Sequence, residues 1–163
     1  MEIRKRTNEN EMFIEFVNGS MWHVVGSDNY DNLVGAPPAG IVFSEWSLCD
    51  PAAWAFLEPI LIENGGWAVF IYTSRGKNHG YTLLNLAKKK EGWMAYIQTA
   101  AETSVFTPLQ LEDALESLVA MYGEEQGNLL FQQEYFCSFA GGSLGAVYAK
   151  ELDQAEKDGR ICD

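Results

Sequence analysis

Residues 40–46 read GIVFSEW, an apolar run that ends in a carboxylate at Glu45. Residues 67–76 read WAVFIYTSRG, a second apolar run that ends at Thr73. Short, continuous apolar runs are typical of parallel strands that are buried on both faces of a sheet. Ligands of open α/β sheets bind outside the carboxyl ends of the strands, where both polar residues fall. The two runs therefore predict an α/β fold with parallel central strands and a ligand site beyond Glu45 and Thr73.

A carboxylate at that edge suits nucleotide hydrolysis, because it can align and deprotonate the water that attacks a γ-phosphate. A hydroxyl that ends the neighbouring strand, as at Thr73, can sense the same phosphate. The sequence contains no G-x-x-x-x-G-K-[ST] loop, which supplies the other half of the usual phosphate site. Read without further context, Glu45 is more simply an ordinary loop residue, and Thr73 can be an ordinary strand cap.

Length and composition fit one globular unit. The chain has 163 residues, of which 47% are hydrophobic, enough for a single core. The three cysteines, Cys49, Cys137 and Cys162, form no C-x-x-C pair, which favours reduced thiols in a cytoplasm. The charged N-terminal residues do not resemble a signal peptide, and no apolar run is long enough to predict a membrane span.

The charge balance argues against a simple nucleic-acid binder, which usually has a basic surface. Eleven basic and 23 acidic residues give a net charge of −12. The basic residues nevertheless cluster at residues 4–6, 75–77 and 88–90. The last cluster is either a solvated helix end or a contact with DNA, and the sequence leaves both interpretations open.

The remaining pattern predicts alternating helices and strands. Asn18-Gly19, between apolar residues 12–17 and 21–25, predicts an N-terminal β-hairpin. Asp50-Pro51 and Asn64-Gly65-Gly66 predict the two ends of a helix over residues 51–62. Further elements are expected in this order: a helix over 78–90, a strand over 93–98, helices over 107–122 and 123–133, a linker over 141–145 and a helix over 147–157.

Several segments, taken in their order and spacing, resemble one known family. They are Asn18–Ser20, Gly26–Asp28, Ile41–Trp54, Leu57–Leu61, Glu63–Ile71, Thr73–His79 and Gln133–Phe139. Together they are similar to the large terminase subunit of tailed bacteriophages, from about Met12 to Arg160. In that family an N-terminal ATPase drives viral DNA into a procapsid and a C-terminal nuclease cuts it. The resemblance implies a partial P-loop NTPase (RecA-like) core over residues 1–139, and a linker with the start of the nuclease region over 140–163.

The resemblance also implies roles for individual residues. Glu45 matches the catalytic carboxylate after the Walker B strand, and Thr73 matches the motif that couples hydrolysis to DNA movement. Ser44 stands where many relatives have an aspartate, so it would hold Mg²⁺ only through a bound water. Ser74 and Arg75 are candidate nucleotide contacts, although Arg75 is equally an exposed residue of a glycine turn. His23 and His79 are interpreted as structural or surface residues.

The resemblance leaves activity open, because neither the phosphate loop nor the nuclease carboxylates lie within residues 1–163. It implies ATP and Mg²⁺ as cofactors, and viral double-stranded DNA, the small terminase subunit and the portal as partners, in the host cytoplasm. An upstream fragment with the phosphate loop would be a further partner, and activity of this chain alone is not expected. The alternative is a non-catalytic interaction module or prophage remnant that docks on a terminase or procapsid component.

Overall fold

The computed structural model describes residues 3–33, 37–140, 154–155 and 158–160. Contacts divide the chain into two compact units, which are described separately below. The first comprises residues 1–43 and 48–69, and the second comprises residues 44–47 and 70–163. The division predicted at residue 139 lies at the border of the described residues and stays a prediction.

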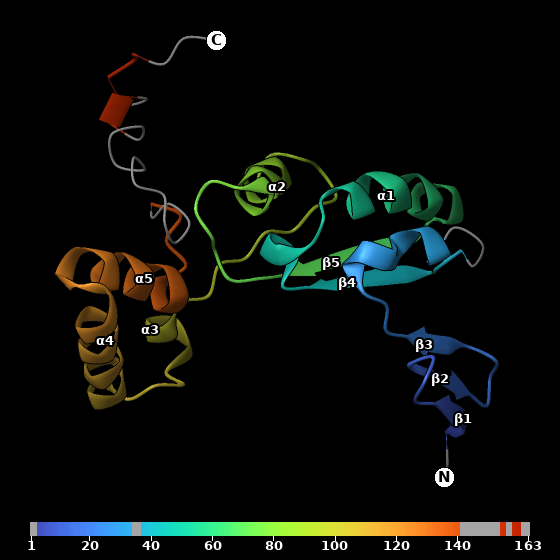
Figure 1. Cartoon of the computed structure of the whole chain (residues 1–163). Coiled ribbons are helices and arrows are strands. Elements are labelled where there is room, and N and C mark those ends of the chain that lie inside the picture. Colours follow the sequence, from blue (N-terminus) through green and yellow to red (C-terminus); the bar gives the residue numbers. More distant parts are fainter. Residues whose placement is uncertain (1–2, 34–36, 141–153, 156–157, 161–163) are drawn as a thin grey trace. The chain divides into compact units, whose positions relative to one another are not determined.

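A three-stranded antiparallel sheet begins the first unit (Figure 1). Its strands are β1 (Arg4–Asn8), β2 (Phe13–Phe16) and β3 (Met21–His23). The predicted hairpin is confirmed as β2 and β3, whose turn is fixed by the Asn18 side chain. Asn18 Oδ1 accepts hydrogen bonds from the Ser20 backbone N–H at 3.0 Å and from the Ser20 hydroxyl at 2.7 Å. Gly19 occupies the left-handed region at φ 84°, where glycine has no steric cost.

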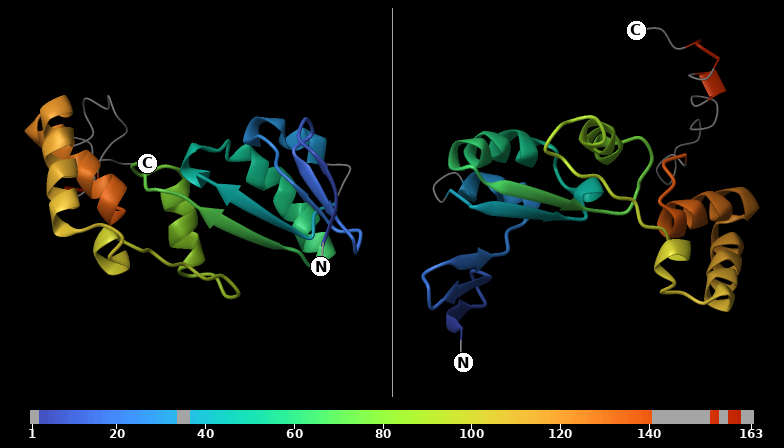
Figure 2. Two further views of the ribbon diagram at one scale, coloured as in Figure 1. Left: turned by 90° about the horizontal axis from the view of Figure 1, so that it is seen from below. Right: turned by 180° about the vertical axis from the view of Figure 1, so that it is seen from behind.

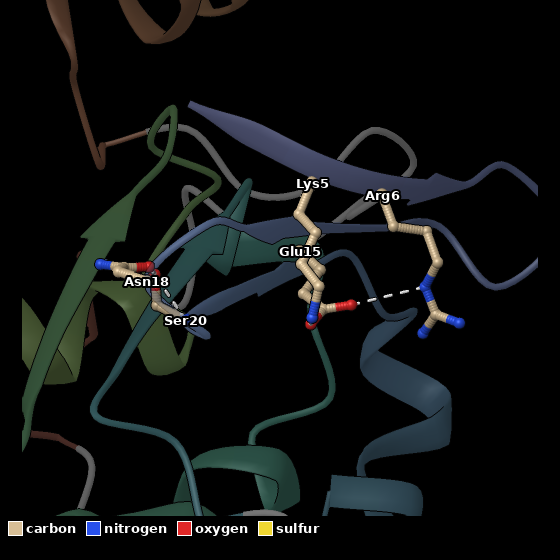
Figure 3. Close-up of polar contacts among 5 residues, drawn as sticks. All are labelled: Lys5, Arg6, Glu15, Asn18 and Ser20. Carbon is tan, nitrogen blue, oxygen red and sulfur yellow. Dashed lines mark hydrogen bonds and ion pairs between the residues drawn. The ribbon is translucent and has the colours of Figure 1, made fainter. Parts of the chain in front are cut away.

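The basic residues of β1 are partly neutralised within this sheet (Figure 3). Lys5 Nζ lies 2.6 Å from Glu15 Oε1, and Arg6 Nε lies 3.5 Å from Glu15 Oε2. The hydrogen bond from Lys5 is the main cause that lowers the pKa of the Glu15 carboxyl below its ordinary value. Because Lys5 and Arg6 are exposed and Glu15 is only partly buried, this cluster orders the sheet surface more than it stabilises the fold.

The two strands predicted as parallel neighbours do share one sheet (Figures 1 and 2). They are β4 (Gly40–Ser44) and β5 (Trp67–Ile71), and helix α1 (Ala52–Asn64) connects them. Gly40 lets the strands pack closely, because a Cβ placed there would come within 2.1 Å of the Trp67 indole. Figure 1 shows α1 over one face of the pair.

Helix α1 begins and ends where the sequence indicated. The Asp50 carboxylate accepts from the Ala52 N–H at 2.9 Å, next to Pro51. At the other end Gly65 adopts φ 63°, and the Gly66 N–H donates to the Leu61 carbonyl at 2.7 Å. The buried side chains Ala53, Leu57 and Leu61 form one stripe along the helix, and Phe43 packs edge-to-face on Trp54.

The prediction that both faces of the parallel strands are buried is wrong for the described chain. The side chains of Trp67, Val69 and Ile71 alternate along β5 and lie on its exposed side, with Ile71 58% exposed. Val42 of β4 is also exposed. The sequence could not reveal this, since an unbroken apolar run contains no alternation to mark an open face.

Four helices follow β5 in the described part of the second unit up to residue 140. They are α2 (His79–Ala87), α3 (Ala100–Thr103), α4 (Pro108–Tyr122) and α5 (Glu124–Phe136). Helices α4 and α5 form a tight hairpin (Figure 2), because a Cβ at Gly127 would lie 2.6 Å from the Val119 backbone. The turn at Thr107 makes a reciprocal capping box with Gln110, as the Thr-Pro start of this predicted helix suggested.

The predicted strand over residues 93–98 does not form. These residues belong to no strand, and no described strand pairs with them. An apolar sequence with β propensity still needs a neighbouring strand to complete its hydrogen bonds. The linker over 141–145 and most of the helix over 147–157 lie outside the described residues.

Candidate functional site

Glu45 follows β4 directly and has an unusual backbone conformation. Its φ is 53°, in the left-handed region that a glutamate rarely adopts. The chain then enters a short 3₁₀ turn, η2 (Trp46–Leu48), whose residues Trp46 and Ser47 are buried. Residues held in such conformations persist only where the surroundings fix them, and they concentrate at functional sites. The exposed Glu45 side chain is thus held at the strand end by a buried turn.

Three hydrogen bonds join the turn after β4 to the loop after β5. The Ser47 hydroxyl donates to the Thr73 carbonyl at 2.7 Å, and Asn78 Nδ2 donates to the Ser47 carbonyl at 3.0 Å. His79 Nε2 lies 2.7 Å from the Trp46 carbonyl, and it must be the donor because a carbonyl can only accept. The backbone at Glu45 and the backbone at Thr73 are therefore parts of one hydrogen-bonded structure.

Asn78 also starts helix α2. Its Oδ1 accepts from the Gly80 N–H at 2.9 Å, so one side chain both caps the helix and holds the β4 turn. The Tyr72 hydroxyl donates to the Gly80 carbonyl at 2.7 Å. Burial raises the pKa of the Tyr72 hydroxyl, which keeps it protonated as a donor at neutral pH.

Ser74 has a structural role. It is buried, and its hydroxyl lies 2.8 Å from the Ser138 carbonyl and 3.2 Å from the Gln133 carbonyl. The hydroxyl has one hydrogen, which these two acceptors share. It ties the loop after β5 to the end of α5. A nucleotide contact by Ser74 stays a prediction, and it would have to use the lone pairs of the oxygen.

Ser74→Ala is expected to lower the free energy of unfolding by about 1–3 kcal/mol, because it leaves two carbonyls without their buried donor. Chemical denaturation followed by circular dichroism measures the change. Ser117→Ala is the matched control, since Ser117 is exposed on α4 and should change stability by less than about 0.5 kcal/mol. Equal effects of the two substitutions would show that the Ser74 hydrogen bond contributes nothing.

Arg75 has a buried donor with no acceptor. Among the described residues, no oxygen accepts from its Nε–H, although that atom is inaccessible to solvent. Such a group costs free energy unless a ligand satisfies it. The adjoining Gly76 is buried and adopts φ 56°, a conformation that favours glycine. The turn that follows Arg75 therefore depends on this glycine. A guanidinium with a spare donor suits a phosphate.

The structure thus brings the predicted site residues into one region of the second unit: Ser44 and Glu45 at the end of β4, and Thr73, Ser74 and Arg75 after β5. The approach of the Glu45 carboxylate to the Thr73 hydroxyl stays a prediction. The sequence analysis missed Ser47 and Asn78. Asn78 carried a signal as the first residue of the helix predicted over 78–90, whereas Ser47 carried none.

The Ser44 hydroxyl and the Glu45 carboxylate fit the limited demands of Mg²⁺. Both residues are exposed at the strand end. Mg²⁺ keeps several waters and needs only one or two protein ligands when a nucleotide supplies phosphate oxygens. A metal ion held by protein ligands alone would need a larger set of side chains. The described residues contain no group of three histidine, cysteine or carboxylate side chains placed to hold one.

The chain has the RecA-like α/β fold seen in a phage large terminase ATPase domain. It is similar to two solved structures of the Thermus phage P74-26 large terminase ATPase domain, one of them a point mutant. Each has a TM-score of 0.61 and 21% sequence identity, and covers 84% of this chain. The chain spans 64% of the length of those solved chains.

The chain matches no family profile and no curated protein. No helix among the described residues combines the length and apolar character needed to cross a bilayer.

Proposed function

We propose that this chain is part of a terminase large subunit and belongs to the ATP-driven motor that packages viral DNA into a procapsid. One observation carries the proposal: Glu45 stands at the end of β4 in a left-handed conformation, and its turn is hydrogen-bonded to the loop that contains Thr73. A hydrolytic carboxylate must be held rigidly relative to the phosphate it serves. This backbone provides that rigidity.

The proposal gives a role to each candidate residue of the site. Glu45 orients and deprotonates the attacking water, and Ser44 would help to hold Mg²⁺ through a bound water. Thr73 senses the γ-phosphate. A movement of Thr73 is passed to the end of α5 by the neighbouring Ser74, whose hydroxyl contacts the Gln133 and Ser138 carbonyls. Arg75 supplies its unsatisfied donor to a phosphate oxygen of ATP. When bound, Mg²⁺ neutralises charge on the phosphates.

The partners of the proposed motor are viral double-stranded DNA, the small terminase subunit, the portal and a polypeptide that supplies a phosphate loop. With a net charge of −12, the chain can attract DNA only through local basic groups. Lys88 and Lys89 are exposed and form no ion pair with another described residue. They are suitable candidates for such a contact.

An ATPase assay of the completed domain tests the proposal. The probe is the part of the P74-26 ATPase domain that has no counterpart in this chain, co-expressed with residues 1–163. Turnover in the complex, and background rates from each part alone, would support the motor. A stable complex without turnover would favour the alternative, an interaction module that docks on a packaging component.

A further inference from the structure

The two residues that follow Glu45 are held through their backbone by the start of helix α2. His79 Nε2 donates to the Trp46 carbonyl at 2.7 Å, and Asn78 Nδ2 donates to the Ser47 carbonyl at 3.0 Å. The two acceptors are consecutive in the chain, and so are the two donors. Trp46 and Ser47 are buried, with 2% and 6% of their surfaces exposed. The turn after Glu45 is therefore bound at two adjacent peptide groups.

His79 contacts Trp46 in a second way. The His79 ring lies edge-on to the Trp46 indole, with the ring centroids 4.9 Å apart and an interplanar angle of 85°. The Phe70 ring contacts the same indole at 5.0 Å. Because His79 contacts both the side chain and the carbonyl of one residue, it restricts rotation of the peptide group that this residue carries. His79 thereby restricts the conformation in which the chain leaves Glu45.

Asn78 connects the turn to helix α2 through its side-chain amide. Its Oδ1 accepts from the Gly80 N–H, while its Nδ2 donates to the Ser47 carbonyl. A backbone N–H only donates and a carbonyl only accepts, so these two partners allow one orientation of the amide. The first turn of α2 is anchored as well, because the Tyr72 hydroxyl donates to the Gly80 carbonyl. The donors that hold the turn after Glu45 are thus themselves fixed.

We propose that Asn78 and His79 are positioning residues for hydrolysis, which hold the turn after Glu45 so that its carboxylate keeps one orientation. The inference rests on the proposed function. The φ of Glu45 is 53°, a conformation that a glutamate keeps only where its surroundings fix it. Accurate placement matters, because a displacement of about 1 Å can cost about 100-fold in rate. His79, interpreted from the sequence as a structural or surface residue, thereby gains a role in the reaction.

Two substitutions of His79 separate its hydrogen bond from its ring packing. His79→Phe keeps an aromatic ring for Trp46 but has no donor, whereas His79→Gln keeps an N–H donor and loses the ring. In the completed domain, His79→Phe should lower kcat by about 10- to 100-fold and leave KM for ATP within about twofold, because a misplaced carboxylate affects turnover and not nucleotide binding. His79→Gln should retain most of the wild-type rate. His23→Phe, at the other histidine of the chain, is the matched control.

Two substitutions of Asn78 remove the donor to the turn and keep the helix cap. Asn78→Asp retains the oxygen that caps α2 and places a second oxygen where the donor was. Asn78→Ser also retains a capping oxygen, adds no charge and is too short to reach the Ser47 carbonyl. Both should lower kcat as His79→Phe does, while circular dichroism shows folded protein at the assay temperature. Asn10→Asp adds the same charge at an exposed position and is the control.

Nuclear magnetic resonance relaxation of the chain alone provides a measurement that does not depend on catalysis. In the wild-type chain, the backbone order parameters of residues 45–47 should lie near about 0.85, the value of a rigid backbone. In His79→Phe and Asn78→Asp they should fall below about 0.6, the range of a flexible backbone. His23→Phe should leave them unchanged.

A loss of turnover that follows the donors at positions 78 and 79 supports the inference. An active wild-type complex whose variants keep the wild-type rate overturns it. So does activity in His79→Phe that is lost in His79→Gln, because ring packing would then be the cause. An inactive wild-type complex refutes the motor function instead. The order parameters then decide whether the two side chains fix the turn, and unchanged values in the variants overturn the inference.

Discussion

Glu45→Gln is expected to lower the ATPase rate of the completed domain by about 10²- to 10⁴-fold, the range typical of a lost general base. Glutamine keeps the size of the side chain and can still hydrogen-bond a water, but it cannot take the proton. ATP binding should change little, because the carboxylate acts on the attacking water. Steady-state turnover with Mg²⁺ and nucleotide titration measure the two effects separately.

Glu63→Gln is the matched control for that experiment. Glu63 is an exposed carboxylate at the end of α1, and its replacement should leave turnover unchanged. If Glu45→Gln retained the wild-type rate in an active complex, the catalytic assignment would be wrong, and the left-handed conformation at Glu45 would need a structural explanation.

Leu57→Ala is expected to lower the free energy of unfolding by about 2–5 kcal/mol, through lost apolar burial and the cavity that remains. Leu57 is 1% exposed on the buried stripe of α1. Ile62→Ala provides the control on the same helix, because Ile62 is 73% exposed and should contribute less than about 0.5 kcal/mol. Denaturant unfolding followed by circular dichroism compares them, and a similar loss from both would contradict the packing of α1.

Local signals in the sequence predicted much of the fold. Asn18-Gly19 located the hairpin, Asp50-Pro51 and Gly65-Gly66 located the ends of α1, and the two apolar runs became neighbouring parallel strands. The hairpin and the ends of α1 depend on residues close together in the chain, whereas the pairing of β4 with β5 joins segments on either side of a helix. The outcome at residues 93–98 shows the limit, because a strand forms only when a partner is present to pair with it.

The sequence indicated which strand ends carry the candidate residues. It did not indicate the hydrogen bonds and the backbone conformation around them. Glu45 and Thr73 could be assigned to one edge because each ends an apolar run. The hydrogen bond from Ser47 to the Thr73 carbonyl could not be predicted, because its acceptor is a backbone group that any residue carries. The left-handed φ of Glu45 has no signature either, since glutamate is not a residue type that favours it. The two features that hold the site together therefore required the structure.

The contact between Ser74 and the end of α5 limits which lengths of that helix are compatible with the site. Both acceptors are backbone carbonyls, so the contact depends on where the helix ends more than on which side chains it carries. One residue inserted into α5 would rotate every later residue by about 100° around the helix axis and advance it by about 1.5 Å. The Ser138 carbonyl would then turn away from Ser74. Natural variants of this chain should therefore tolerate substitution along the exposed face of α5 far better than a single insertion or deletion within it.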